Sequence, residues 1–449
     1  MITHINDFSK LARSHLLSVK VSGKDKEMKK HIVFLLGSYY PHYSAVGRCL
    51  GNIADVFEDK YRVTVIGMLS QSNQLHEEEY RSQKIIRVTT RRNNRRICLE
   101  ESNTVDCLGG LLQKSKRILS QINNVLYLLS PGGSAAKDWI ASYKAALRKI
   151  SDPIDLIIPT CNPFETVIVA LDYKKEHPQT EVIPFLFDLY ADNQRMNRTS
   201  FIKRMKWNKN IKLEKRMLQE ANFVFYVPNW TSHIKKYHHD QLSHCQEVEH
   251  PLLVKRDVKN GDIPIISDSP ERILHIVYTG VVDLQNRNPR FMLAIIPVLG
   301  IYNLSFDFYA FGSADHIIEN AAKEEGRVKY FGKVSTFEAE TARCNSDFLL
   351  SLGNSDFSQV PSKLFEYFSV GKPIVHFALT KDDPAIKLLE GYPCKLILLQ
   401  DDNPKRNAEK LESFIEKNSG EKISINSIFE VYKYAQPTEI AKAIEAHMS

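Results

Sequence analysis

Several kinds of segment are missing from this chain of 449 residues. No stretch approaches the ~20 consecutive apolar residues of a membrane-spanning helix, and the first residues are too polar and too interrupted for a signal peptide. The seven cysteines are odd in number and include no C-x-x-C pair, which disfavours a disulfide framework and a cysteine metal site. The sequence therefore predicts a cytoplasmic protein with at most peripheral membrane contact.

Two signatures of other enzyme classes are also absent. The chain has no Asp-x-Asp, the carboxylate pair with which many metal-dependent transferases hold Mn²⁺ or Mg²⁺ against a diphosphate. The turn after its first expected strand is not G-x-G-x-x-G, which disfavours a nicotinamide dehydrogenase. His238 and His239 are adjacent, so they are expected to point apart as surface histidines rather than to share a metal. The sequence predicts neither a metal site nor a cofactor.

The composition is that of a globular protein, with 43% hydrophobic and 25% charged residues, and the length favours two or three domains. The net charge of +7 is unevenly spread. Residues 81–97 hold seven Lys or Arg and no acid, and residues 201–216 hold seven basic residues and one Glu. Such clusters suit anionic phospholipid head groups, nucleic acid or a polyphosphate ligand. A solvated basic face is the competing interpretation.

Short apolar runs rich in β-branched residues alternate with helical patterns along most of the chain, which is typical of parallel sheets built from β-α-β units. In the first half, strands are expected to start near His31, Val63, Lys84, Asp155, Glu181 and Asn222. In the second half, they are expected to start near Ile273, Phe306, Val328, Asp347, Lys372 and Lys395. Two sets of six strands predict an α/β protein with two doubly wound, Rossmann-like domains.

A polar segment rich in Pro, Gly and Asp, KRDVKNGDIPIISDSP, lacks helical periodicity and is expected to link the two domains. The expected boundaries are 1–255 for the first domain, 256–270 for the linker, 271–434 for the second domain and 435–449 for a last helix that crosses back to the first domain. Within the first domain, residues 1–29 form an extension and residues 106–149 a largely helical insertion. Apolar patches of the insertion, at 108–112 and 125–129, could face lipid, although core packing is the commoner fate of such patches.

Small residues follow the first expected strand. In an open α/β sheet, ligands bind beyond the carboxyl ends of the strands, so the residues after each strand are the first candidates. Ser44, Ala45 and Gly47 lie where the chain turns into a helix. Exposed N–H groups at such a helix start can bind a phosphate or a sugar. An ordinary tight turn would have the same composition.

The second half has two further candidate segments. Gly280 ends a strand, and Arg287 follows in a loop from which it could pair bidentately with a diphosphate. In SQVPSKLFEYFSVGKPIV, residues 358–375, Pro361 suits the first turn of a helix and Gly371 its C-terminal cap.

The helix predicted in this segment has a buried stripe of Leu364, Phe365 and Phe368. Lys363 and Glu366 lie away from that stripe as i,i+3 neighbours. Lys363 and nearby backbone N–H groups could hold a phosphate, while Glu366 could bind the two ribose hydroxyls of a nucleotide. A surface ion pair between these two residues is the competing interpretation.

Three of these segments resemble motifs of glycosyltransferase family 4. PSKLFEYFSVGKPIV, between two strands, looks like the donor-binding segment of that family, which is usually written as Glu, seven residues, Glu. YTG with a downstream RNP resembles its diphosphate loop, and YYP followed by SAVG resembles its acceptor-side loop. The order, spacing and strand context agree over roughly residues 30–400. The resemblance implies a GT-B fold, in which two Rossmann-like domains face each other across a cleft.

Residue by residue, the resemblance implies that Glu366 binds the ribose and that Ser362 and Lys363 contact the phosphates. It assigns the departing diphosphate to Arg287, with help from Lys363. Ser358 stands where the family has its first Glu, which contacts hydroxyls of the donor sugar. Because of this departure, the resemblance leaves the identity of the donor sugar open. It also leaves open, to a lesser degree, whether the chain is catalytically active.

The remaining matches lie in the loops after other strands. Gly280 is the glycine of the diphosphate loop, and Val282 replaces a basic residue that the family often has two places after that glycine. Gly332 and Lys333 fall where the nucleotide base usually docks. In the first domain, Asp188 occupies an end-of-strand position where many relatives have a catalytic-site His or Asp. Capping of the following turn is the structural alternative for Asp188.

The resemblance implies a retaining, metal-independent glycosyltransferase of the hexosyltransferase type. Its donor would be a nucleoside-diphosphate sugar, with a UDP-sugar favoured over a GDP-sugar. Its acceptor would be a saccharide or a lipid-linked sugar of surface polysaccharide synthesis, at the inner face of the plasma membrane. A catalytically silent sugar-nucleotide-binding subunit and a GT-B epimerase are the alternatives. Nucleic acid is not expected as a partner, because no nucleic-acid-binding module accompanies the basic clusters.

Overall fold

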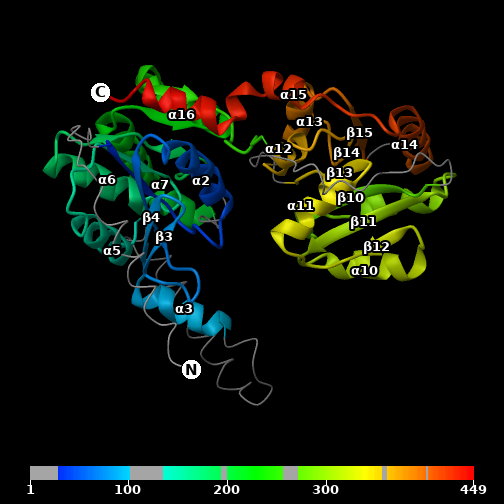
Figure 1. Ribbon diagram of the computed structural model, residues 1–449, viewed down its shortest axis with the longest axis horizontal. Helices are drawn as coiled ribbons and strands as arrows, with labels where there is room; N and C mark the ends of the chain where they lie inside the picture. Colours follow the sequence, from blue (N-terminus) through cyan, green and yellow to red (C-terminus); the bar gives the residue numbers. More distant parts are fainter. Residues whose placement is uncertain (1–28, 102–134, 194–199, 256–271, 356–361, 401–402) are drawn as a thin grey trace, which may run out of the picture.

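The computed structural model describes residues 29–101, 135–193, 200–255, 272–355, 362–400 and 403–449. Within them it contains two six-stranded sheets and one small three-stranded sheet. The two large sheets lie in separate halves of the molecule, and each is flanked by helices (Figure 1). The prediction of an α/β protein with two Rossmann-like units is therefore confirmed.

The first sheet has the strand order β3-β4-β2-β1-β5-β6. Its strands are β1 (His31–Leu35), β2 (Arg62–Met68), β3 (Glu77–Tyr80), β4 (Gln83–Val88), β5 (Leu156–Pro159) and β6 (Glu181–Val182). All neighbouring strands pair in parallel except β3 and β4. Every residue of β1 is buried, because helices pack on both faces of this sheet. Burial on both faces is why β1 reads as an unbroken apolar run.

Helices of the first half surround this sheet. They are α2 (Ala45–Phe57), α3 (Arg91–Glu101), α5 (Lys137–Arg148), α6 (Glu165–Glu176), α7 (Ser200–Glu220) and α8 (Thr231–Tyr237). In α5, Tyr143 is buried and its hydroxyl donates to the Leu36 carbonyl oxygen over 2.6 Å. This part of the expected insertion is therefore a core helix. The rest of the insertion, 106–134, with both apolar patches, lies outside the described residues.

The strand expected from Glu181 is divided in two. After β6 the chain reaches Pro184, and β7 (Phe185–Leu186) begins at the next residue. β7 belongs to the small sheet, in which it pairs with β8 (Val224–Tyr226), and β8 pairs with β9 (Cys245–Glu247). The prediction of one continuous strand is wrong here because a proline supplies no backbone N–H to a ladder.

The second sheet has the order β12-β11-β10-β13-β14-β15, and all its pairs are parallel. Its strands are β10 (Leu274–Val281), β11 (Leu304–Phe311), β12 (Val328–Tyr330), β13 (Phe348–Leu352), β14 (Ile374–Ala378) and β15 (Lys395–Leu399). The helices of this half are α9 (Arg290–Leu293), α10 (Asp315–Glu324), α11 (Thr336–Asn345), α12 (Lys363–Phe368), α13 (Pro384–Leu389), α14 (Pro404–Asn418) and α15 (Ile425–Val431). The last helix of the chain is α16 (Pro437–Glu445). All six strands expected in this half are present.

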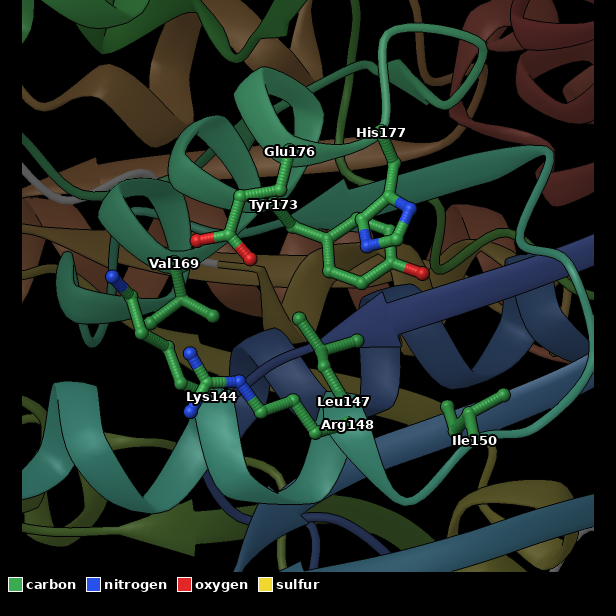
Figure 2. Close-up of a pocket in the computed structure, with 8 residues that line it drawn as sticks. All are labelled: Lys144, Leu147, Arg148, Ile150, Val169, Tyr173, Glu176 and His177. Atoms are coloured by element: carbon green, nitrogen blue, oxygen red, sulfur yellow. The ribbon is translucent and has the colours of Figure 1, made fainter.

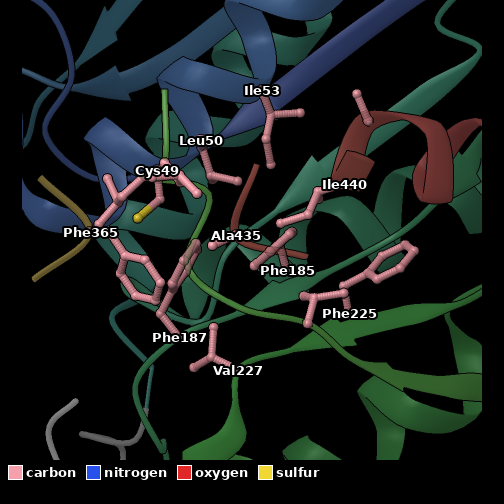
Figure 3. Packing of buried hydrophobic residues seen from close by; sticks show 14 of the residues in the cluster. Cys49, Leu50, Ile53, Phe185, Phe187, Phe225, Val227, Phe365, Ala435 and Ile440 are labelled. Carbon is pink, nitrogen blue, oxygen red and sulfur yellow. The ribbon is translucent and has the colours of Figure 1, made fainter. Parts of the chain in front are cut away.

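One hydrophobic cluster includes residues from both halves of the molecule. Phe365 of α12 lies beside Cys49 and Leu50 of α2, and Phe187, which follows β7, belongs to the same buried group (Figure 3). The His250 ring lies 5.8 Å from the ring of Phe187 and 6.2 Å from that of Phe365, centroid to centroid. The two halves are therefore joined by apolar packing where α2 meets α12.

The last helix, α16, lies on the first half of the molecule and contacts α2 (Figure 1). Lys60 Nζ and Glu445 Oε1 are 3.1 Å apart, and the Ser449 N–H donates to the Glu181 carboxylate over 3.0 Å. The chain thus crosses back to the first half after completing the second. The expected linker, 256–270, lies outside the described residues.

Candidate functional site

Most of the candidate residues of the second half gather at the carboxyl edge of its sheet. Gly280 is the next-to-last residue of β10 and has a φ of +144°, and Gly332 follows β12 with a φ of +70°. Only glycine adopts such backbone angles readily, so both loops turn sharply at the strand ends. The loops after β10, β12 and β13 leave the same edge, because these strands are parallel members of one sheet.

Arg287 is held in a tight loop after β10. The backbones of Asp283 and Arg287 exchange hydrogen bonds of 3.1 and 3.0 Å, and the Asp283 carboxylate accepts from the N–H groups of Gln285 and Asn286. Arg287 Nε donates to the side-chain oxygen of Asn354 over 2.6 Å. The guanidinium group is therefore positioned by the loop that follows β13.

A second group of charges surrounds the Glu366 carboxylate. Lys363 Nζ lies 2.9 Å and an Arg343 nitrogen 3.3 Å from Glu366 Oε2. Arg343 also donates to Thr279 Oγ1 over 3.1 Å, and its side chain is only 3% exposed. Lys363 and Glu366 are about one-third exposed. Lys363 and Glu366 form the ion pair that the sequence offered as the competing interpretation, and this pair lies in a partly buried group rather than on an open surface.

The positive charges of this region act on one another. Burial lowers the pKa of Lys363; the Glu366 carboxylate opposes that shift, and the Arg343 and Arg287 guanidinium groups reinforce it. Arg287, Arg343 and Lys363 are called the cation cluster below. Arg343 and Lys363 face the Glu366 carboxylate, and Arg287 acts on Lys363 and on the Asp283 carboxylate. Three positive charges against two carboxylates leave a positive balance that suits an anionic ligand such as a diphosphate.

Helix α12 brings Lys363 and Glu366 to this edge. Leu364, Phe365 and Phe368 are fully buried, as the sequence predicted. Tyr367 is also buried; its hydroxyl donates to the Leu350 carbonyl and accepts from the Thr279 N–H.

Residues at the two ends of α12 complete this segment. The C-cap of α12 is Ser369, so Gly371, which was expected at the cap, lies two residues beyond it with a φ of +69°. Ser362 lies at the start of α12 and makes no side-chain cap hydrogen bond there. Ser358 and Pro361 lie outside the described residues.

The expected base-docking residues lie at the end of a broad hollow. The hollow has a volume of about 1210 Å³ and runs over one face of β10, β11 and β12 beside α11. Tyr309 and Phe331 line it and stack with ring centroids 4.4 Å apart. Gly332 and Lys333 follow directly, and the Lys333 ammonium group lies 5.3 Å from the centre of the Phe311 ring.

On the first half, Ser44 caps helix α2. Its hydroxyl oxygen accepts from the Gly47 N–H over 3.0 Å. A Cβ atom on Gly47 would lie 2.1 Å from the Ser38 carbonyl oxygen, so close packing of the turn against the helix requires glycine here. Ser44 and Ala45 are exposed. The predicted acceptor-side loop is therefore a tight capped turn with Ser44 and Ala45 at the surface and Gly47 buried.

Asp188 follows β7 and lies in a half-buried position. Its carboxylate accepts from the Asn162 side-chain amide over 3.4 Å, and its carbonyl oxygen accepts from the Cys161 thiol over 3.0 Å. Burial raises the pKa of the Cys49 thiol on α2, and the carboxylates of Glu366 and Asp188 both act in the same direction. Cys49 thus lies within electrostatic reach of one candidate residue from each half.

A smaller hollow lies away from these residues. It has a volume of about 200 Å³ between α5 and α6 and is lined by Lys144, Arg148, Tyr173 and His177 among others (Figure 2). These residues lie in the last turns of the two helices, towards the amino ends of the strands. Ligand pockets are typically about 300–1,000 Å³, so this hollow is too small for a nucleotide sugar.

The structure corrects the expectation for His238 but not for His239. His239 is exposed, whereas His238 is only 1% exposed and lies 3.1 Å from Glu214 Oε2. His233 Nε2 lies 2.8 Å from the same oxygen. The adjacent histidines do point apart, as predicted. The sequence did not indicate that His238 would meet a second histidine and a buried carboxylate.

Acidic neighbours partly neutralise the first basic segment, 81–97. Lys84 pairs with Glu77 at 3.4 Å, and the buried Arg87 pairs with Glu78. These acids belong to β3, a short polar strand that the sequence did not predict. Helix α3 extends away from the sheet (Figure 1), and its arginines lie in the first half of the helix. None of the helices in the described part of the chain is long and apolar enough to cross a membrane.

Comparison with known proteins identifies the fold. No protein-family model and no curated protein sequence matches the chain. A sucrose-phosphate synthase from Thermosynechococcus elongatus superimposes with a TM-score of 0.58 at 10% identity, covering 93% of this chain and 98% of that one. HepE from Anabaena, in complex with UDP and glucose, superimposes with a TM-score of 0.52 at 13% identity, covering 93% of this chain and 98% of that one. A trehalose-6-phosphate protein from E. coli bound with UDP-2-fluoro glucose superimposes with a TM-score of 0.55 at 10% identity, covering 93% of this chain and 99% of that one.

Two Rossmann-like units, with a cation cluster at the carboxyl edge of one sheet, define the chain as an α/β protein. The structural likeness over almost the whole chain makes the architecture more specific. The chain has the GT-B fold of glycosyltransferases.

Proposed function

We propose that the chain is a retaining, metal-independent glycosyltransferase. It moves a sugar from a nucleoside-diphosphate sugar, with UDP favoured over GDP, to a saccharide or lipid-linked acceptor in surface polysaccharide synthesis. The cation cluster carries the proposal: Arg343 and Lys363 contact Glu366, and Arg287 is held by Asn354 and acts on Lys363. Solved structures of the same fold that contain UDP or a UDP-sugar analogue support the choice of ligand.

The donor binds with its diphosphate at Arg287 and Lys363, with further contact at Ser362. Gly280 and Gly332 let the backbone approach it closely, Lys333 lies beside the base, and Glu366 binds the ribose. As the bond between the sugar and the diphosphate breaks, negative charge grows on the leaving group. Arg287 and Lys363 stabilise this charge from fixed positions, so the side chains of the protein do the work that a metal ion does in other transferases.

The acceptor enters from the first half, past the turn of Ser44, Ala45 and Gly47. Its hydroxyl attacks the oxocarbenium-like sugar from the face that the diphosphate leaves, so the configuration is retained. Asp188 orients this hydroxyl or the transferring sugar, and residue 358 contacts the hydroxyls of the donor sugar. A catalytically silent nucleotide-sugar-binding subunit is the alternative that Ser358 favours, because the family Glu is absent there. A GT-B epimerase is a further alternative.

Binding of a nucleoside diphosphate tests the donor site. We expect one of the nucleoside diphosphates UDP, GDP and ADP, and not the monophosphate CMP, to raise the melting temperature. The same nucleotide should give calorimetric binding of equal affinity with EDTA and with added Mg²⁺. Glu366→Ala is expected to weaken this binding by about tenfold or more, because a charged hydrogen bond to the ribose contributes about 1.5–3 kcal/mol.

The matched control is Glu409→Ala, an exposed glutamate on α14 of the same half, which should bind like the wild type. Binding that is unchanged in Glu366→Ala would remove the ribose role of this residue. Failure of all three nucleoside diphosphates to bind the wild type would exclude the donor site itself.

We also propose that the basic segments 81–97 and 201–216 contact an anionic membrane surface. In α7, Phe201 is 70% exposed and Met205 39% exposed among lysines and arginines, a combination that suits the head-group region of a bilayer. We expect the protein to co-sediment with phosphatidylglycerol vesicles at low salt, but not with phosphatidylcholine vesicles, and to be released by high salt. Equal recovery with both lipids, or none with either, would contradict this.

A further inference from the structure

A buried polar cluster in the first half lies apart from the proposed donor site. The Glu214 carboxylate of α7 meets His233, within α8, and His238, which follows α8. Glu214 Oε2 lies 2.8 Å from His233 Nε2 and 3.1 Å from His238 Nε2. The three side chains are 0%, 3% and 1% exposed in the same order. Both imidazoles therefore direct the same ring nitrogen at one oxygen in the protein interior.

This arrangement has the shape of a divalent metal site. The three ligand atoms lie within 4.8 Å of one another, and the two imidazole centroids are 5.8 Å apart. Two imidazoles and a carboxylate are a usual ligand set for Zn²⁺, with bonds of about 2.0–2.2 Å and ligand atoms about 3.4 Å apart in a tetrahedron. The two nitrogen–oxygen separations of 2.8 and 3.1 Å need to open by about 0.6 and 0.3 Å to reach this spacing.

Charge balance favours a cation at this point. The Ala191 N–H donates to Glu214 Oε1 over 2.8 Å, and two neutral imidazoles can donate to Oε2. These bonds satisfy the carboxylate but leave its negative charge buried, and a buried charge requires compensation. Lys206 is buried on the same helix, but two turns away, at about 12 Å along the axis. A divalent ion among the three side chains supplies the charge directly.

Neighbouring polar atoms also lack partners. Among the described residues, the side-chain oxygens of Asn210 and Asn229 and the indole N–H of Trp230 are buried without a hydrogen bond. Asn210 lies one helical turn before Glu214, and the Trp230 ring lies 5.5 Å from that of His233. A zinc ion takes a fourth ligand in a structural site. The Asn210 amide oxygen or a buried water provides a neutral oxygen for that position.

We propose that Glu214, His233 and His238 bind one Zn²⁺ ion in a closed structural site. All three ligands are buried, so no coordination position faces bulk water, and this distinguishes the site from a catalytic one. The ion fixes α7 to α8 and, through the hydrogen bond from Ala191 to Glu214, fixes the segment that begins at Asp188. This inference concerns the first half alone and does not depend on nucleotide binding by the second half.

Metal analysis of the intact chain tests this site. The protein is purified without chelator, loaded with Zn²⁺, dialysed and examined by elemental mass spectrometry. We expect about one zinc per chain in the wild type and less than about a tenth of that in His238→Gln, whose amide can still donate to Glu214 but is a poor zinc ligand. His239→Gln removes the exposed neighbouring histidine and should retain zinc. Zn²⁺ should raise the melting temperature of the wild type and of His239→Gln, but not of His238→Gln.

A second measurement needs no variant and covers the case in which His238→Gln does not fold. Cobalt-loaded wild type should show the intense visible absorption of four-coordinate Co²⁺, and zinc X-ray absorption should find nitrogen and oxygen neighbours without sulphur. A wild-type chain that retains no zinc after loading would overturn the proposal. Zinc retained equally in His238→Gln, or a sulphur neighbour, would also overturn it, because either result places the ion elsewhere.

Discussion

Arg287→Ala is expected to lower kcat/KM for release of the nucleoside diphosphate from the donor by about two orders of magnitude, or ~3 kcal/mol in the barrier. The guanidinium group is fixed by its 2.6 Å bond to Asn354, so it needs no reorganisation when charge develops on the leaving group. Its loss removes a stabilising charge that matters most in the transition state. The rate is measured with the donor identified by the nucleotide screen, from the nucleoside diphosphate that is released.

Two variants make this result specific. Arg287→Lys keeps the charge but loses the planar group that Asn354 holds, and it should fall between the alanine variant and the wild type. Arg290→Ala removes an exposed arginine three residues later and should leave the rate unchanged. A rate of Arg287→Ala within twofold of the wild type would remove Arg287 from the mechanism. A wild type that binds nucleotide but releases none from any sugar donor would favour the catalytically silent alternative.

Gly47→Ala is expected to lower the free energy of unfolding by about 3 kcal/mol or more. The new Cβ would lie 2.1 Å from the Ser38 carbonyl oxygen and 3.2 Å from Ser44 Oγ, so the capped turn or the start of α2 must move. Alanine favours a helix over glycine by only about 1 kcal/mol, which does not offset a backbone collision. α2 also contributes Cys49 and Leu50 to the cluster that joins the two halves, so the shift is transmitted to that packing.

Gly326→Ala is the matched control, because a Cβ there meets no atom within 4 Å. Urea unfolding, followed by circular dichroism, compares the two variants with the wild type. Equal midpoints for Gly47→Ala and the wild type would show that the turn at Ser38 relaxes freely. The expected role of this turn in admitting an acceptor would then lose its structural basis.

The strands of the second half could be predicted from the sequence because both faces of their sheet are covered. Buried parallel strands read as continuous apolar runs, as in Phe348–Leu352 and Ile374–Ala378. The strands that were missed, β3 and β9, are short and polar, and their pairing partners rather than their own residues make them strands. Pro184 interrupts an otherwise apolar run, so the single strand expected there is divided into β6 and β7.

The candidate site was predicted where neighbours in the sequence form it and missed where the fold brings distant residues together. Lys363 and Glu366 lie on one helix, so their spacing indicated the pair. Arg343 reaches Glu366 from α11 and also bonds Thr279, 64 positions earlier, and no local pattern reveals such a contact. Asn354 directly follows the end of β13 and could have been found by the strand-end rule that pointed to Arg287.

The burial of His238 was missed for the same reason. Adjacency showed correctly that His238 and His239 point apart, but burial of one of them depends on α7, which supplies Glu214. The two clusters that the sequence did not reveal, around Arg343 and around Glu214, are both assembled by helices from different parts of the chain. Both contain charges that are nearly or fully buried, which makes their partners in space as important as their positions in the sequence.

The position of α16 has a consequence for the order in which the molecule is made. Pro437 comes 380 positions after Phe57, and this length takes roughly 20–80 s to synthesise at 5–20 residues per second. During that time the face of α2 that α16 covers has no partner from this helix, although the strands beneath it have long left the ribosome. The half that is translated first is therefore the last to be completed, and a nascent chain must keep that apolar face from aggregating until translation ends.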